Sequence, residues 1–169
     1  MVSASITGVR RGEAGSPGEL KGVFTDDGQL GALNVNNATG VYGTLSRRPD
    51  VTLSLPVAFS YEVKEGKATI LTTVSGSQPK EYEVMIERIN HSDAETTKNM
   101  VLRITDPELL EKTGGIVQGM SGSPILQNGR LVGAVTHVFV NDPTKGYGIF
   151  AENMDKTLQS VAAQGVLAA

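Results

Sequence analysis

Residues 119–135 read Gly-Met-Ser-Gly-Ser-Pro-Ile-Leu-Gln-Asn-Gly-Arg-Leu-Val-Gly-Ala-Val, and this stretch decides the fold. Asn128-Gly129 separates two apolar segments, and both residues tolerate the positive φ of a type I′ turn, so the stretch predicts a β-hairpin. Ser121 precedes this hairpin in a loop with Gly119 before it and Gly122 after it. A nucleophile needs backbone freedom beside it and a rigid scaffold behind it. Ser121 is therefore the candidate nucleophile.

The composition excludes several classes of function. The chain has 169 residues, a net charge of −3 and no basic block, so neither nucleic acid nor an anionic membrane is expected as a partner. It has no cysteine, which excludes disulfides and thiolate chemistry. Its two histidines, His91 and His137, are far apart in the sequence and form no metal-ligand pattern. We therefore expect no metal and no cofactor, and no apolar run approaches membrane-spanning length.

The chain predicts a mainly β fold. About ten short apolar or alternating segments are separated by turns, which is typical of a β-barrel or a pair of barrels. Residues 1–75 are expected to form the remainder of a first barrel, and residues 76–155 a second barrel that contains the serine loop. Residues 152–163 have the spacing of an amphipathic C-terminal helix.

Several finer elements follow from local patterns. Alternation over residues 51–55 predicts a strand. Residues 57–63 and 67–74 predict a hairpin that turns at Lys64-Glu65-Gly66. Turns are also expected at residues 26–28 and 141–146.

Asp106-Pro107-Glu108 predicts the start of a short helix. It provides an acidic N-cap, a proline at the first helical position and a carboxylate near the positive end of the helix dipole. Gly114-Gly115 is expected to end the helix.

The stretch from Gly119 to Pro124 resembles the Gly-Asp-Ser-Gly-Gly-Pro loop of chymotrypsin-like serine peptidases. This resemblance implies that Ser121, and not Ser123, is the nucleophile, with the N–H groups of Gly119 and Ser121 as the oxyanion hole. Met120 replaces the aspartate that pairs with a freed N-terminus in trypsin-like zymogens, so activation by that salt bridge is not expected. A tight turn without chemistry is the alternative interpretation of this pattern.

A longer resemblance covers about residues 5–155. Residues 113–129 and 133–148, together with Gly15-Ser-Pro-Gly-Glu19, resemble the SpoIVB peptidases of endospore-forming bacteria. The resemblance implies a chymotrypsin-like double β-barrel and a secreted serine endopeptidase. The resemblance further implies that this endopeptidase acts in the space between forespore and mother cell. Its expected substrate is a protein that regulates a membrane-embedded protease complex, and its cleavage would permit pro-sigma-K processing. Members of the family also have a PDZ domain and an N-terminal membrane anchor, which this chain does not contain.

The catalytic histidine of that family lies in a Gly-Ala-Leu-Gly-His segment that has no counterpart in this chain. Gly31-Ala32-Leu33-Asn34 is superficially similar, but Asn34 cannot act as a base. The chain is therefore expected to be a fragment of a serine peptidase domain whose first barrel is incomplete at its N-terminus, with little or no activity alone.

The sequence allows two interpretations for each of two further residues, His137 and Asp106. His137 is expected to be a half-buried strand histidine that bonds a backbone group, with a role in a specificity pocket as the alternative. By resemblance Asp106 is the acid member of the catalytic triad, and from its own sequence context it is a helix cap.

A competing hypothesis is a non-catalytic β-barrel that binds a partner, with residues 141–146 as the contact surface. A barrel that lacks its first strands also exposes an unpaired strand edge, through which the fragment could self-associate.

Overall fold

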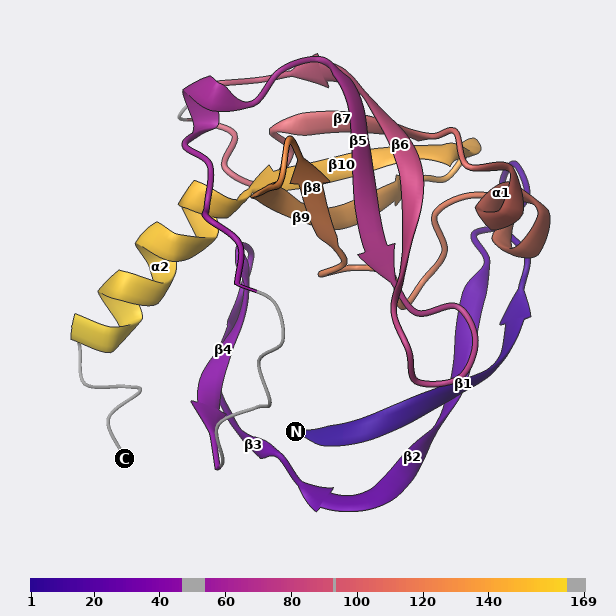
Figure 1. The fold of residues 1–169 in the computed structure, drawn as a ribbon, viewed down its shortest axis with the longest axis horizontal. Helices are drawn as coiled ribbons and strands as arrows, with labels where there is room; N and C mark the ends of the chain where they lie inside the picture. The colour runs from indigo at the N-terminus through magenta and orange to yellow at the C-terminus, as the bar shows by residue number, and fades with distance from the viewer. Residues whose placement is uncertain (47–53, 93, 164–169) are drawn as a thin grey trace.

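The computed structural model describes residues 1–46, 54–92 and 94–163. Its centre is a closed barrel of six strands in the order β10-β7-β6-β5-β8-β9 (Figure 1). Every pairing in the barrel is antiparallel. In chain order the six strands are β5 (Gly66–Thr72), β6 (Lys80–Ile89), β7 (Met100–Ile104), β8 (Pro124–Gln127), β9 (Arg130–Phe139) and β10 (Asp142–Phe150).

The barrel interior is the hydrophobic core. On β6, Tyr82, Val84 and Ile86 are buried, while the residues between them are more exposed, as expected for a strand with one face on the core. Residues 132–135 of β9 are all buried. Helix α2 (Ala151–Ala163) packs against β9 and β10, which accounts for this continuous burial.

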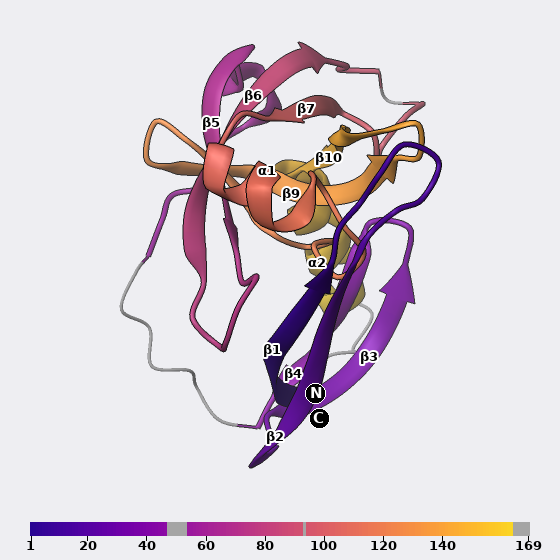
Figure 2. The ribbon, with the colours of Figure 1, turned by 90° about the vertical axis from the view of Figure 1, so that its right-hand side faces the viewer.

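The N-terminal strands form two separate two-stranded sheets. They are β1 (Val2–Arg10) with β2 (Glu19–Gln29), and β3 (Gly31–Asn37) with β4 (Gly40–Leu45). Both sheets lie to one side of the closed barrel (Figure 2). Within the described residues they do not close into a second barrel, so the prediction of an incomplete first barrel is confirmed.

Three helical segments complete the described chain. Helix α1 (Pro107–Thr113) begins after Asp106 and ends at Gly114, whose φ of 74° is left-handed, as the sequence predicts. Helix α2 confirms the predicted C-terminal helix within one residue. A short 3₁₀ helix, η1 (Ser60–Glu62), precedes β5. In the ranges that the structure describes, no helix combines the length and apolar character needed to cross a membrane.

The hairpin predicted for residues 57–74 is wrong. Its first arm contains the η1 helix, and β5 pairs with β6 and β8 instead. The reason is a side-chain bridge at Lys64: its N–H donates to Gln127 Oε1 at 3.0 Å, and Gln127 Nε2 donates to its carbonyl at 2.9 Å. This bridge joins Lys64 to the end of β8, so the chain does not fold back on itself there.

Other predicted boundaries also move. Residues 26–28 lie within β2, and β10 begins at Asp142, so the turn expected at residues 141–146 is mostly strand. An irregular register between β9 and β10 accommodates these polar residues without breaking the strand. The sequence predicts that the first barrel ends at residue 75, but β5, which precedes this residue, belongs to the closed barrel. The strand predicted at residues 51–55 falls largely outside the described residues, and residues 54–55 are not in a strand.

Asn99 is a buried polar residue that joins the barrel to α2. Its Oδ1 accepts hydrogen bonds from the Phe150 amide and from Asn153 Nδ2, both at 3.0 Å, and its Nδ2 donates to the Glu95 carbonyl at 2.8 Å. We expect Asn99→Ala to lower the free energy of unfolding by about 2–4 kcal/mol, because the buried Phe150 amide loses its acceptor. Urea unfolding measures this. Asn153→Ala is the matched control, with an expected loss of about 1 kcal/mol, and equal effects of the two variants would contradict the assignment.

Glu152 joins the first turn of α2 to η1. It accepts the Ser60 N–H at 2.8 Å and lies 2.9 Å from Lys156 Nζ, and these contacts lower its pKa from 4.5 to about 2, the Lys156 bond most. The stabilisation by Glu152 is therefore present above pH 4.5 and is lost as the pH falls from 4.5 towards 2. We expect the wild type and Glu152→Gln to differ most in free energy of unfolding near neutral pH and to converge in this acid range. A difference that stays constant from pH 7 to pH 2 would contradict this linkage.

Candidate active site

The serine loop is held between α1 and the hairpin of β8 and β9. Gly119 has a φ of +100° and Gly122 a φ of +89°, conformations that glycine adopts without strain. The Gly122 N–H donates to the Val135 carbonyl at 2.8 Å, and the Val135 N–H donates to the Ser123 carbonyl at 2.9 Å. These two bonds attach the loop to β9, a central strand of the barrel, so the glycine-flanked loop has a rigid support.

The two serines of the loop lie in different environments. Ser121 is exposed, and its Oγ donates to the Thr136 carbonyl at 2.7 Å. Ser123 is buried, and its hydroxyl bonds Thr72 Oγ1 at 3.0 Å inside the barrel. Ser121 is therefore the serine whose hydroxyl is accessible to a substrate.

Two backbone donors beside Ser121 have no acceptor. The N–H groups of Gln118, Met120 and Gly122 all bond carbonyl groups. Among the described residues, the N–H groups of Gly119 and Ser121 have no hydrogen-bond partner. Unpaired amides next to an exposed hydroxyl are the donors that an oxyanion hole requires.

Met120 anchors the loop from inside. Its side chain is fully buried, and its sulfur accepts the Val117 N–H at 3.3 Å, while its own N–H donates to the Val117 carbonyl at 3.1 Å. An apolar side chain thus holds the position at which trypsin-like zymogens have an aspartate. The loop keeps its conformation without a buried ion pair.

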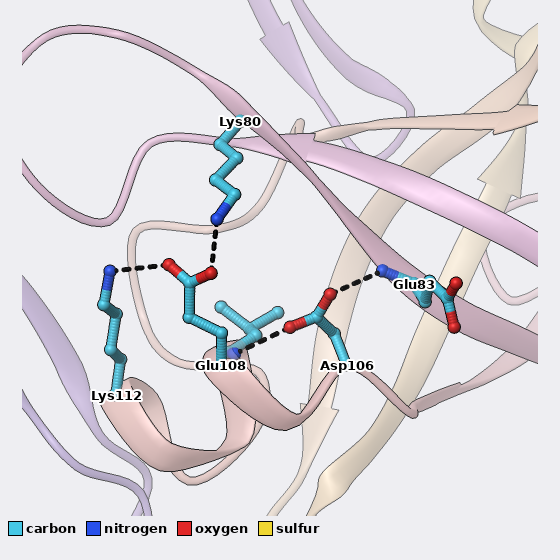
Figure 3. Close-up of polar contacts among 6 residues, drawn as sticks. Lys80, Glu83, Asp106, Glu108 and Lys112 are labelled. Atoms are coloured by element: carbon cyan, nitrogen blue, oxygen red, sulfur yellow. Dashed lines mark hydrogen bonds and ion pairs between the residues drawn. The ribbon is translucent and has the colours of Figure 1, made fainter.

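Asp106 uses both carboxylate oxygens in backbone hydrogen bonds (Figure 3). Oδ1 accepts the Leu109 N–H at 3.0 Å and so caps α1, and Oδ2 accepts the Glu83 N–H from β6 at 3.2 Å. The predicted helix cap is confirmed by these contacts. Within the described part of the chain, no hydrogen bond joins Asp106 to Ser121 or to a histidine.

An exposed ion-pair cluster lies beside the cap. Glu108 contacts Lys80 of β6 and lies 2.8 Å from Lys112 Nζ, one turn further along α1 (Figure 3). The bonds from Lys112 and Lys80 lower the pKa of Glu108 to about 2. The cluster links α1 to β6 and, being solvent-exposed, contributes little to the free energy of folding.

Neither histidine is bonded to Ser121. His137 follows Thr136 on β9 and is exposed, and its imidazole makes no hydrogen bond to any described residue, so the prediction of a half-buried histidine bonded to the backbone is wrong. The strand alternation turns this side chain away from the core face. His91 is exposed and stacks on Phe150 with ring centroids 5.5 Å apart. The described residues also contain no group of three side chains suited to bind a metal ion.

Sequence reasoning missed the acceptor of the Ser121 hydroxyl. The Thr136 carbonyl is a backbone group, so no side-chain pattern marks it. Only the register of the hairpin, in which Gly122 bonds Val135, places it next to the serine.

A six-stranded antiparallel barrel with an exposed serine beside unpaired amides is the arrangement expected of a chymotrypsin-like serine peptidase. The family model "SpoIVB peptidase S55" matches residues 1–155, and the chain belongs to this family. Among curated proteins, none matches the chain in sequence.

The chain is similar to several solved structures of proteases. The HtrA-type protease AlgW, solved with a decapeptide, has a TM-score of 0.52 and 14% identity, over 88% of this chain and 44% of that chain. Rv3671c protease from M. tuberculosis in its active form has a TM-score of 0.49 and 18% identity, over 86% of this chain and 64% of that chain. The inactive form of Rv3671c from M. tuberculosis H37Rv, solved as a serine-to-alanine mutant, has a TM-score of 0.48 and 15% identity, over 87% of this chain and 71% of that chain. The chain thus spans less than half of AlgW.

The two hydrogen bonds that Asp106 accepts give this residue a role in stability. Asp106→Ala removes both acceptors, and we expect it to lower the free energy of unfolding by about 1–2 kcal/mol. Asp106→Asn keeps one oxygen for the cap and should lose about half of this. Urea unfolding is the measurement, with exposed Thr105→Ala as the control. If Asp106→Ala were as stable as this control, the cap would not contribute.

Proposed function

We propose that this chain carries the nucleophile and the oxyanion hole of a serine endopeptidase of the SpoIVB type. The observation that supports this most is the exposed Ser121 hydroxyl beside the unpaired amides of Gly119 and Ser121. An accessible hydroxyl next to two unpaired donors suits acyl transfer, and a loop with only a structural role would not need either feature.

In the proposed reaction, a base takes the Ser121 proton as Oγ attacks the carbonyl carbon of the scissile peptide. The carbonyl oxygen becomes an oxyanion that accepts hydrogen bonds from the amides of Gly119 and Ser121. The base then returns the proton to the leaving amine, the C–N bond breaks, and water hydrolyses the acyl-enzyme. Before attack the hydroxyl must leave the Thr136 carbonyl, which costs about the 0.5–1.5 kcal/mol of a neutral hydrogen bond.

We infer that the base is a histidine outside these 169 residues. Neither His91 nor His137 is bonded to Ser121. The family's Gly-Ala-Leu-Gly-His segment, upstream of the region matched here, is the proposed source. These 169 residues alone would then have little or no peptidase activity.

We propose Asp106 as the acid of the triad on the family resemblance alone. Its position fifteen residues before Ser121 supports this, and its bonds to the Leu109 and Glu83 amides support the alternative of a purely structural cap. Replacement by asparagine in an active protein separates the two roles, because the cap oxygen remains while the negative charge is lost.

The family membership also supports a biological proposal. The natural protein would act outside the cytoplasm, between forespore and mother cell, on a regulator of a membrane-embedded protease complex, and so promote pro-sigma-K processing. A membrane anchor and a PDZ domain would belong to the same natural protein.

A non-catalytic binding or self-associating domain is the second candidate. An apolar cavity of about 450 Å³ supports it, because exposed Val41, Val57 and Leu158 line its walls. Phe24 of β2, which is 82% exposed, adds apolar surface on the N-terminal sheets. Sedimentation of the 169-residue chain would show whether copies associate through these surfaces.

Ser121 and Ser123 give a matched test of the peptidase proposal. In the natural protein that contains these residues, we expect a fluorophosphonate probe to label Ser121 and not Ser123. Ser121→Ala should lower the rate of peptide cleavage by about 10⁴-fold or more, because the nucleophile is lost. Ser123→Ala should keep the labelling, since its hydroxyl only bonds Thr72.

The 169-residue chain should not be labelled on the same time scale. Rapid labelling of this chain would show that one of its own groups activates Ser121, and would contradict the proposal of an external histidine. Unchanged cleavage by a folded Ser121→Ala variant would favour the binding domain.

A further inference from the structure

The unpaired Gly119 N–H belongs to the central peptide of a β-turn. The turn is formed by Val117–Met120, because the Met120 N–H donates to the Val117 carbonyl at 3.1 Å. Gly119, the third residue of the turn, has a φ of +100°, and Gln118, the second, is not among the residues with positive φ. A positive φ at the third residue alone is the conformation of a type II turn.

A turn of this kind has two possible orientations of its central peptide. A type I turn keeps the same ends, but its central peptide is rotated by about 180° and its third residue has a negative φ. The two bonds that close this turn, from Met120 N–H to the Val117 carbonyl and from Val117 N–H to the Met120 sulfur, do not involve the central peptide. Glycine adopts either sign of φ, so Gly119 itself selects neither orientation.

A hydrogen bond from β2 distinguishes the two orientations. The Leu20 N–H donates to the Gln118 carbonyl at 2.9 Å. In a trans peptide the C=O and the N–H point in opposite directions, so this bond turns the Gly119 N–H away from β2. In the type I orientation the Gly119 N–H would instead face the Leu20 N–H. Two donors would then oppose each other, and the Leu20 N–H would lose its acceptor, which is unfavourable.

The orientation of this peptide also decides whether it can bind an oxyanion. In the type II orientation the Gly119 N–H has no partner among the described residues and can donate to substrate. In the type I orientation the Gln118 carbonyl would point where this N–H now points, and its partial negative charge would repel an oxyanion.

We propose that Leu20 is a positioning residue of the peptidase, and that its backbone N–H holds the Gln118–Gly119 peptide in the orientation that forms the oxyanion hole. The proposal rests on the proposed function, because it concerns the same site. It makes the N-terminal sheet of β1 and β2 a part of the catalytic apparatus, although neither strand belongs to the closed barrel.

Nuclear Overhauser spectroscopy of the 169-residue chain measures the orientation of the peptide directly. The α-hydroxy analogue of leucine at position 20 replaces the N–H by an ester oxygen and keeps the side chain. The same replacement at Ala58 is the matched control, because the Ala58 N–H donates to the Leu131 carbonyl at the same distance of 2.9 Å. The Gly119 N–H lies close to the Gln118 Hα in a type II turn and close to the Gln118 N–H in a type I turn. We expect the Hα contact in the wild type and the Ala58 ester, and a shift towards the N–H contact in the Leu20 ester.

Labelling of Ser121 by a fluorophosphonate probe measures the consequence for catalysis. In the natural protein that contains these residues, we expect the Leu20 ester to be labelled about 3- to 10-fold more slowly than the wild type, the change in population that one neutral hydrogen bond produces. The Ala58 ester should be labelled at the wild-type rate. Each rate is divided by the folded fraction from circular dichroism, so that a loss of stability does not count as a loss of positioning.

The outcomes separate the two proposals. If the Leu20 ester keeps the wild-type Overhauser contacts, or is labelled as fast as the Ala58 ester, the role of Leu20 is overturned while the peptidase proposal stands. If the wild-type natural protein is folded but Ser121 is not labelled, the peptidase proposal fails and the role of Leu20 in catalysis falls with it.

Discussion

The site depends on one reciprocal pair of backbone hydrogen bonds between the serine loop and Val135. The Gly122 amide bonds the Val135 carbonyl, and the Val135 amide bonds the Ser123 carbonyl. Because β9 is paired on both sides within a closed barrel, this pair transfers the rigidity of the barrel to a loop that is itself outside regular structure. With Gly122 and Ser123 fixed in this way, Ser121 projects towards solvent and its own amide stays outside the sheet pairing.

The N-terminal sheets support the same loop from the other side. The Gln118 amide donates to the Gly18 carbonyl, and the Leu20 amide donates to the Gln118 carbonyl, both at 2.9 Å. Leu20 also lies against Gly119, where an added Cβ would approach the Leu20 side chain to 3.1 Å. The N-terminal strands therefore contact the loop segment that carries the unpaired Gly119 amide, and they support this segment from outside the closed barrel.

The sequence predicted the parts of the fold that rest on local backbone chemistry. The Asn128-Gly129 turn adopts positive φ at both residues, and Asp106 caps a helix that Gly114 ends. Each of these signals depends on residues that lie close together in the sequence. The hairpin predicted around Lys64 failed because Gln127, sixty-three residues away in sequence, supplies the competing hydrogen bonds.

The candidate site likewise has features that follow from local sequence and features that depend on residues distant in the sequence. The choice of Ser121 over Ser123 followed from a motif, and the structure places the first hydroxyl in solvent and the second inside the barrel. The hydroxyl's acceptor, the Thr136 carbonyl, required the hairpin register. To predict the exposure of His137, one must know which face of β9 is covered. The sequence of β9 does not show this, because α2 and the barrel interior bury both faces of its central part, so buried and exposed residues do not alternate.

The two roles of Asp106 do not exclude each other physically. A carboxylate has about four lone-pair positions, and the amides of Leu109 and Glu83 use one on each oxygen. An imidazole could still donate to a remaining position. The capping bonds would then act as positioning contacts, because they fix the carboxylate on a helix terminus and a barrel strand at once. A histidine that approaches one of the remaining lone-pair positions would therefore give Asp106 both roles at once.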